Sequence, residues 1–173
     1  MNKQITHVSL DLETLATSTK AIVLSVGIAT SCGREFHLFI DLHGQVDAGR
    51  ELSIDTMMWW MQQSDAARAV QVGATRHEVQ VARQHLVEFF ASLPSGYLVW
   101  GNAPSFDCDI LADFMGAKPW PFWAERDVRT VRMAVGSTKA DIAHDSLSDA
   151  KAQLVDVLKF VNLANAARAQ AGL

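Results

Sequence analysis

The sequence predicts an α/β fold in which a mixed sheet of about five strands is flanked by helices. Short segments with the pattern of strands open the chain, and longer segments with helical periodicity follow them. Size agrees with this fold class, because 173 residues of which 49% are hydrophobic suffice for one domain with its own core. We therefore expect residues 1–173 to form a single domain.

The predicted strands begin near the N-terminus. Residues 5–12 alternate between apolar and polar side chains, which is typical of a strand with one face toward the core. Residues 21–30 are almost continuously apolar, as expected for a strand buried on both faces. A turn at Ser31-Cys32-Gly33-Arg34 then predicts a hairpin that returns through residues 35–40. Two shorter strands are expected at residues 97–101 and 125–128.

Helices are predicted in between and at the C-terminal end. Residues 54–63, rich in methionine and tryptophan, form the first, and Thr75-Arg76-His77-Glu78 reads as a capping box that opens the second. A third helix covers residues 107–115 and ends at Gly116, and the last runs from about residue 147 to 169. The expected apolar stripe of this last helix is Leu147, Ala150, Leu154, Leu158 and Val161.

Composition limits the classes of function. The chain has 15 basic and 19 acidic residues, so a nucleic-acid substrate requires a small contact or bound cations that reverse the local charge. Cys32 and Cys108 form no C-x-x-C motif, which indicates free thiols in a reducing cytoplasm. No signal peptide and no apolar run of ~20 residues are present, so we expect no membrane association.

Asp11 and Glu13 are the first candidates for chemistry. Side chains alternate along a strand, so these two carboxylates share one face at the end of the first predicted strand. Two anions this close repel each other, and a shared cation would stabilise both. A solvated strand end is the alternative reading of the same pair.

Asp107 is the second candidate. At helical spacing it shares a face with the apolar residues Ile110, Leu111 and Phe114, which indicates that its carboxylate is not simply solvated. The alternative is a helix-start residue that interacts with the helix dipole.

His144 and Asp149 precede and open the last helix. Ser146 and Asp149 together match a capping box with the shorter acid, which is a purely structural explanation. A lone histidine such as His144 is also common at surfaces. A functional reading is favoured because these residues and the other acids all fall at the ends of elements around one sheet edge.

With these motifs the chain resembles the DEDDh exonucleases, which carry four acids and a histidine on a ribonuclease-H-like sheet. The histidine five residues before the final aspartate is the spacing of the DEDDh branch, and more narrowly the chain looks like small bacterial and phage 3′–5′ exonucleases of the DexA type. The resemblance rests on Ser9-Leu10-Asp11-Leu12-Glu13-Thr14, Ser105-Phe106-Asp107 and His144-x-x-x-x-Asp149.

The resemblance implies a mechanism and a substrate. Asp11, Glu13, Asp107 and Asp149 would hold two divalent cations, Mg²⁺ or Mn²⁺, and His144 would take a proton from the attacking water. The implied substrate is a single-stranded 3′ end of RNA or DNA, with RNA slightly favoured, and the products are 5′-mononucleotides. Related small exonucleases are often homodimers, which makes a homodimer one implied assembly.

Several roles stay open at the level of sequence. Trp59, Trp60 and Asn102 are candidate substrate contacts, although a helix rich in methionine and tryptophan is as often core or interface. Arg126, Arg129 and Arg132 are candidates for phosphate contacts or simply a solvated face. Two other functions fit the same residues: a non-catalytic nucleic-acid-binding domain and a phosphoesterase acting on small nucleotides.

Overall fold

The computed structural model describes residues 6–172, which contain a mixed five-stranded sheet with the strand order β3-β2-β1-β4-β5. The strands are β1 (His7–Thr14), β2 (Val23–Thr30), β3 (Glu35–Phe39), β4 (Leu98–Gly101) and β5 (Glu125–Asp127). β1 pairs antiparallel with β2 and parallel with β4, so the predicted mixed sheet and the hairpin are both confirmed.

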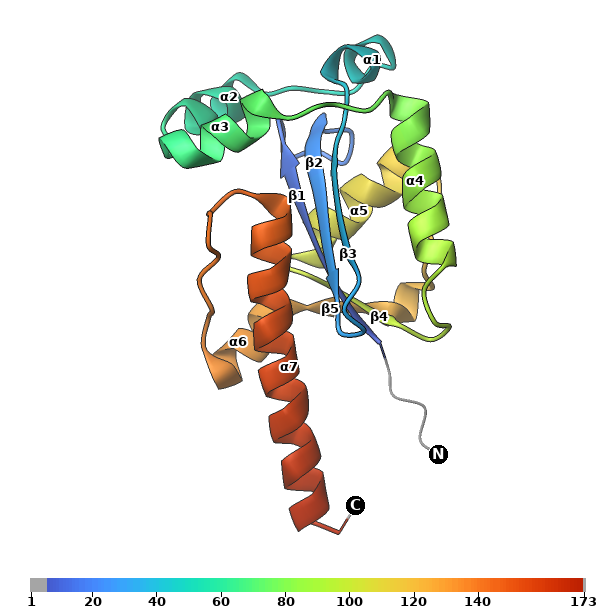
Figure 1. Cartoon of the computed structure of the whole chain (residues 1–173), viewed down its shortest axis with the longest axis vertical. Coiled ribbons are helices and arrows are strands. Elements are labelled where there is room, and N and C mark those ends of the chain that lie inside the picture. Colours follow the sequence, from blue (N-terminus) through green and yellow to red (C-terminus); the bar gives the residue numbers. More distant parts are fainter. Residues whose placement is uncertain (1–5, 173) are drawn as a thin grey trace.

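Helices cover both faces of this sheet. α6 and α7 lie on one face and α4 and α5 on the other, while α1, α2 and α3 gather beyond the end of β1 (Figure 1). Within residues 6–172, no helix combines the length and the apolar character that crossing a membrane requires. The helices are α1 (Leu42–Asp47), α2 (Ile54–Met61), α3 (Asp65–Gly73), α4 (Val79–Ala91), α5 (Pro104–Met115), α6 (Val128–Val135) and α7 (Ser146–Gln170).

The central strand β1 is longer at its C-terminal end than its alternating pattern indicates. Its pairing with β2 continues from Val8 to Thr14, with an irregularity after Glu13. Asp11 and Glu13 therefore lie within a paired strand rather than beyond it, which aligns both side chains on one face. Ile5, the predicted first residue of the strand, lies outside the described residues.

The predicted capping box at residues 75–78 is wrong. The His77 N–H donates to the Phe39 carbonyl at 2.9 Å and the His77 carbonyl accepts from the Asp41 N–H at 2.8 Å, so this segment extends alongside the end of β3. α4 consequently begins only at Val79, and Glu78 precedes it without a side-chain cap. The short helices α1, α3 and α6 were not expected from periodicity, because segments of six to nine residues carry too few repeats to define a face.

α7 contacts the sheet through a different face from the predicted apolar stripe. Its buried residues are Ser146, Ala150, Ala152, Gln153, Asp156 and Val157. Of the predicted stripe only Ala150 is buried, whereas Leu147, Leu154, Leu158 and Val161 are half-buried. The cause is the close approach of two backbones. The start of α7 lies directly against β2 at Gly27, so only small or slender side chains fit between helix and strand.

We expect Gly27→Ala to destabilise the protein strongly, because the added Cβ would lie 2.0 Å from the Ser146 carbonyl carbon and must displace backbone. Overpacking of this kind costs about 1–3 kcal/mol or more in the free energy of unfolding. Gly73→Ala is the matched control, since nothing lies within 4 Å of its Cβ position. Urea denaturation of both variants measures the effect, and equal stabilities would show that α7 does not approach β2 this closely.

Candidate active site

β1 presents Asp11 and Glu13 to α7. Ser9 on the same face of β1 donates to Gln153 of α7, which shows that this face is covered by the helix. Glu13 is buried, and Asp11 lies directly opposite Gly27 in the β1–β2 register. The absence of a side chain at Gly27 thus lets α7 close over the strand pair next to Asp11.

α5 brings Asp107 to the same place from the other side of β1. Asp107 lies in the first turn of α5, and its Oδ1 accepts a hydrogen bond from the Leu12 N–H at 3.2 Å. A Cβ at Gly101 would lie 3.2 Å from Asp107 Oδ2, so the preceding strand passes close to the carboxylate. Asp107 is buried together with Ile110 and Phe114, as its spacing along the helix predicts.

The turn before α7 orients His144 and Asp149. Asp145 caps the helix by accepting from the Ser148 N–H at 2.8 Å, so the Ser146 capping box is wrong. Asp149 Oδ2 instead accepts from the His144 N–H at 2.8 Å. His144 has φ of 62°, a left-handed conformation that this hydrogen bond helps to hold.

All five predicted catalytic residues line one cavity of about 220 Å³. Ligand atoms of Glu13, His144 and Asp149 lie within 4.8 Å of one another, a spacing at which they could hold a metal ion. The remaining lining residues are Leu12, Asn102, Phe106, Arg132 and Gln153.

The carboxylates destabilise one another's charged forms. Burial raises the pKa of Glu13 to about 9, and the charges of Asp149 and Asp107 act in the same direction. Burial also raises the pKa of Asp107 to about 8, although backbone N–H groups oppose this rise. The pKa of Asp11 lies well above its ordinary value because of burial and the neighbouring acids. Such a cluster either binds protons or requires compensating positive charge.

Gln153 is a site residue that the sequence-based reasoning missed. Its Nε2 donates to Asp11 Oδ1 at 2.7 Å, and its Oε1 accepts from Ser9 Oγ at 3.4 Å. The signal was available, because Gln153 follows Asp149 by four residues and so shares its face of α7. The amide thus fixes one oxygen of Asp11.

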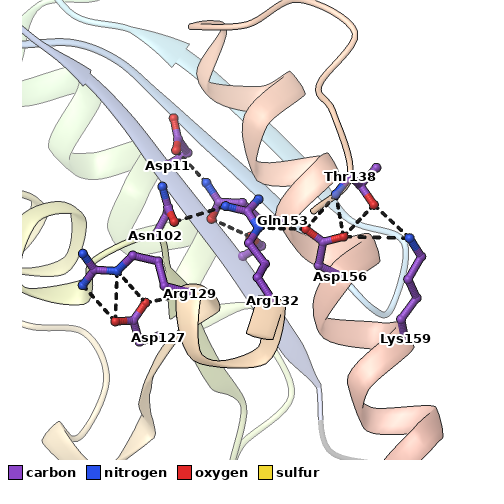
Figure 2. A network of polar contacts seen from close by, with 10 residues as sticks. Asp11, Asn102, Asp127, Arg129, Arg132, Thr138, Gln153, Asp156 and Lys159 are labelled. Atoms are coloured by element: carbon purple, nitrogen blue, oxygen red, sulfur yellow. Dashed lines mark hydrogen bonds and ion pairs between the residues drawn. The ribbon is translucent and has the colours of Figure 1, made fainter. Parts of the chain in front are cut away.

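A polar network extends from this cavity into the layer of α6 and α7 (Figure 2). Arg132 of α6 donates through Nε to Asp156 Oδ2 at 2.9 Å and through Nη1 to Asn102 Oδ1 at 3.1 Å. The other two candidate arginines do not line the cavity: Arg129 pairs with Asp127, and Arg126 donates to backbone carbonyls.

A second cavity of about 490 Å³ adjoins the first and shares Leu12, Glu13 and Phe106 with it. Trp59 and Trp60 both line it but differ in burial. Trp60 is buried, and its Nε1 donates to the Thr14 carbonyl at 2.9 Å. Trp59 is 41% exposed, and its ring meets the His144 ring edge-on with centroids 4.8 Å apart. Neighbouring positions on a helix point about 100° apart, which accounts for this division.

Comparisons with solved structures show the fold. The apo form of exonuclease I matches with a TM-score of 0.64 and 12% identity over 93% of this chain and 42% of that one. The zinc-bound complex of E. coli exonuclease I with single-stranded DNA matches with a TM-score of 0.67 and 12% identity over 94% and 41%. The chain therefore spans about two fifths of the length of exonuclease I.

Comparisons of sequence show the family. No curated protein matches the chain significantly. The model of the 3′–5′ exoribonuclease Rv2179c-like domain matches residues 6–160, a stretch that includes both sides of the cavity and all five predicted catalytic positions. The expectation of a 3′–5′ exonuclease relative is thereby confirmed, and the chain belongs to the family of 3′–5′ exoribonuclease Rv2179c-like domains.

Proposed function

We propose that the protein is a metal-dependent 3′–5′ exonuclease that removes 5′-mononucleotides from single-stranded 3′ ends. The observation that carries the proposal is the convergence of Asp11, Glu13, Asp107, His144 and Asp149 on one cavity of about 220 Å³. Membership of the exoribonuclease family supports the reaction and favours RNA as the substrate.

The donor set fits hard divalent cations. Asp11, Glu13, Asp107 and Asp149 offer only carboxylate oxygens, the ligands that Mg²⁺ and Mn²⁺ prefer. The raised pKa values of Glu13 and Asp107 agree with a cluster that positive charge would stabilise. We assign these four side chains as the ligands of two cations. When bound, such ions stabilise the attacking and leaving oxygens of an in-line displacement at phosphorus.

His144 is assigned as the general base. Its ring lies beside Glu13 and Asp149 and is packed against Trp59, which restricts its orientation. Histidine is the side chain most often used to accept a proton from attacking water. Its left-handed backbone and the hydrogen bond to Asp149 fix the distance between the base and the carboxylates.

The adjoining cavity is suited to the terminal nucleoside. Its volume is about 490 Å³ and it borders Glu13, so a nucleoside bound there would lie next to the carboxylates. Trp59 offers an exposed aromatic face for stacking on a base, a contact that tolerates any sequence. Trp60, buried beside Trp59, lines the same cavity and is held by its hydrogen bond to the Thr14 carbonyl.

A small footprint agrees with the charge of the chain. With 15 basic against 19 acidic residues, contact with two or three phosphates is expected, each adding roughly 0.7 to the salt slope on single strands. A 2′-hydroxyl gives a small site an additional group to bind, which again favours RNA. The resemblance to small exonucleases also favours a homodimer, which light scattering would measure.

The test is hydrolysis of oligomers with Mg²⁺ or Mn²⁺. We expect 5′-labelled single-stranded RNA to shorten one nucleotide at a time, with release of 5′-monophosphates, and RNA to be cut faster than DNA. A circular strand and a strand with a 3′-phosphate should resist. Cleavage of the circle would indicate an endonuclease. Hydrolysis of small nucleotides alone would indicate a phosphoesterase, and binding without hydrolysis a non-catalytic domain.

In EDTA, we expect thermal stability to fall as the pH rises from 6 to 9. Folded Glu13 and Asp107 keep protons up to pH values of about 9 and 8, whereas the unfolded acids lose them near pH 4, so folding takes up protons across this window. Asp11→Asn should flatten the decline, because one repelling carboxylate is removed, and should nearly abolish hydrolysis. Differential scanning fluorimetry with and without Mn²⁺ measures the melting temperature.

Asp47→Asn is the control for this measurement, because Asp47 is an exposed acid of α1 outside the cavity. It should keep both hydrolysis and the wild-type dependence on pH. A melting temperature in EDTA that rises between pH 6 and pH 9 would contradict the crowding of these carboxylates.

His144→Asn should lower the hydrolysis rate by about 10²–10⁴-fold with little change in Mn²⁺ affinity, because it removes the base but no cation ligand. Asparagine adopts the left-handed conformation readily, so the turn before α7 should keep its shape. His43→Asn, at an exposed histidine, is the control. Isothermal titration calorimetry decides the role, since loss of Mn²⁺ binding would make His144 a ligand.

A further inference from the structure

Arg132 is the only lysine or arginine among the described residues that line the carboxylate cavity. The other charged groups there are Asp11, Glu13, Asp107 and Asp149, with His144 beside them. A nucleic acid brings further negative charge into this place. A positive charge fixed in the cavity would therefore reduce the repulsion between the carboxylates and the substrate.

The guanidinium of Arg132 is held from two directions (Figure 2). Asp156 is fully buried on α7, and it accepts from the Thr138 N–H at 2.9 Å as well as from Arg132 Nε at 2.9 Å. Asn102, in the segment between β4 and α5, accepts from Nη1 at 3.1 Å. Two separate segments thus set the orientation of this side chain before any substrate binds, and Thr138 in turn holds Asp156.

These contacts leave donors of the guanidinium unused. An arginine carries five N–H groups, and those of Nη2 make no hydrogen bond with any residue that the structure describes. The charge also acts on one of the cavity's carboxylates: burial raises the pKa of Asp149, and the charge of Arg132 acts against that rise. The unused donors and the position in the cavity suit a bidentate contact with phosphate.

We propose that Arg132 binds a phosphate of the nucleic acid in this cavity, and that Asp156 and Asn102 position its guanidinium for that contact. The proposal rests on the proposed nuclease function. It distinguishes Arg132 from Arg126, which is exposed in β5 and whose Nη1 donates to the carbonyls of Trp123 and Glu125.

The test uses binding in the inactive Asp11→Asn background, measured by fluorescence anisotropy with a single-stranded oligoribonucleotide in Mn²⁺. Adding Arg132→Gln should weaken binding about 10- to 100-fold, the usual effect of losing a hydrogen bond to a charged group. It should also reduce the slope of binding against salt by roughly 0.7. Arg126→Gln in the same background should change neither quantity.

Oligomers in which one linkage is made neutral identify which phosphate Arg132 contacts. Oligomers with one methylphosphonate at the last or the next-to-last linkage remove a single phosphate charge each. At the contacted linkage, the weakening caused by Arg132→Gln should shrink to less than about threefold. Equal weakening with all oligomers and an unchanged salt slope would overturn the proposal and leave Arg132 a structural residue.

A second variant serves as a control for loss of stability, because Arg132→Gln leaves the buried Asp156 carboxylate without its main cation. The double variant Arg132→Gln/Asp156→Asn removes both charges and should show the same loss of binding at wild-type stability. If this double variant binds as tightly as the parent, the proposal fails. The proposed nuclease function is judged separately, by hydrolysis with the otherwise wild-type protein.

Discussion

The close contact between α7 and β2 at Gly27 determines how the rest of the site is assembled. A helix that begins directly on a strand sends its side chains at three- and four-residue spacing down onto the neighbouring strand. In this chain those positions are Asp149, Gln153 and Asp156, and each makes a polar contact at or next to the cavity. The face of α7 that lies on the sheet is therefore as polar as it is apolar, which small residues such as Ala150 make sterically possible.

The carboxylates of the cavity accept hydrogen bonds from several different elements rather than from one shared partner. Asp107 accepts from the Leu12 backbone, Asp11 from the Gln153 amide and Asp149 from the His144 backbone. These donors are neutral, so they orient the carboxylates but do not cancel their charge. That division leaves the net negative charge of the cavity available to cations, while Arg132, the one arginine among the described residues that line the cavity, is itself engaged with Asp156.

The sequence predicted the sheet well because strand patterns are local signals, and the positions it proposed as catalytic lie together in one cavity. Continuous apolar character marked β2, and motif spacing located Asp11, Asp107 and Asp149. Long-range contacts account for the failures. The segment at His77 extends because it pairs with the end of β3, and the buried face of α7 is set by Gly27, more than a hundred residues away. The contacts of Gln153 with Asp11 and of Arg132 with Asn102 likewise join different elements, so local sequence patterns do not indicate them.

The regular spacing of polar residues along α7 has a consequence for how the chain can vary in length. One inserted residue between Asp149 and Asp156 would rotate the rest of α7 by about 100°. Asp149 could then still accept from the His144 N–H, but Asp156 would no longer face Arg132. The half-buried and exposed turns after Val157 carry no such contact with the cavity. Lineages of this domain should therefore differ in length at the far end of α7 and keep an unbroken register across its first three turns.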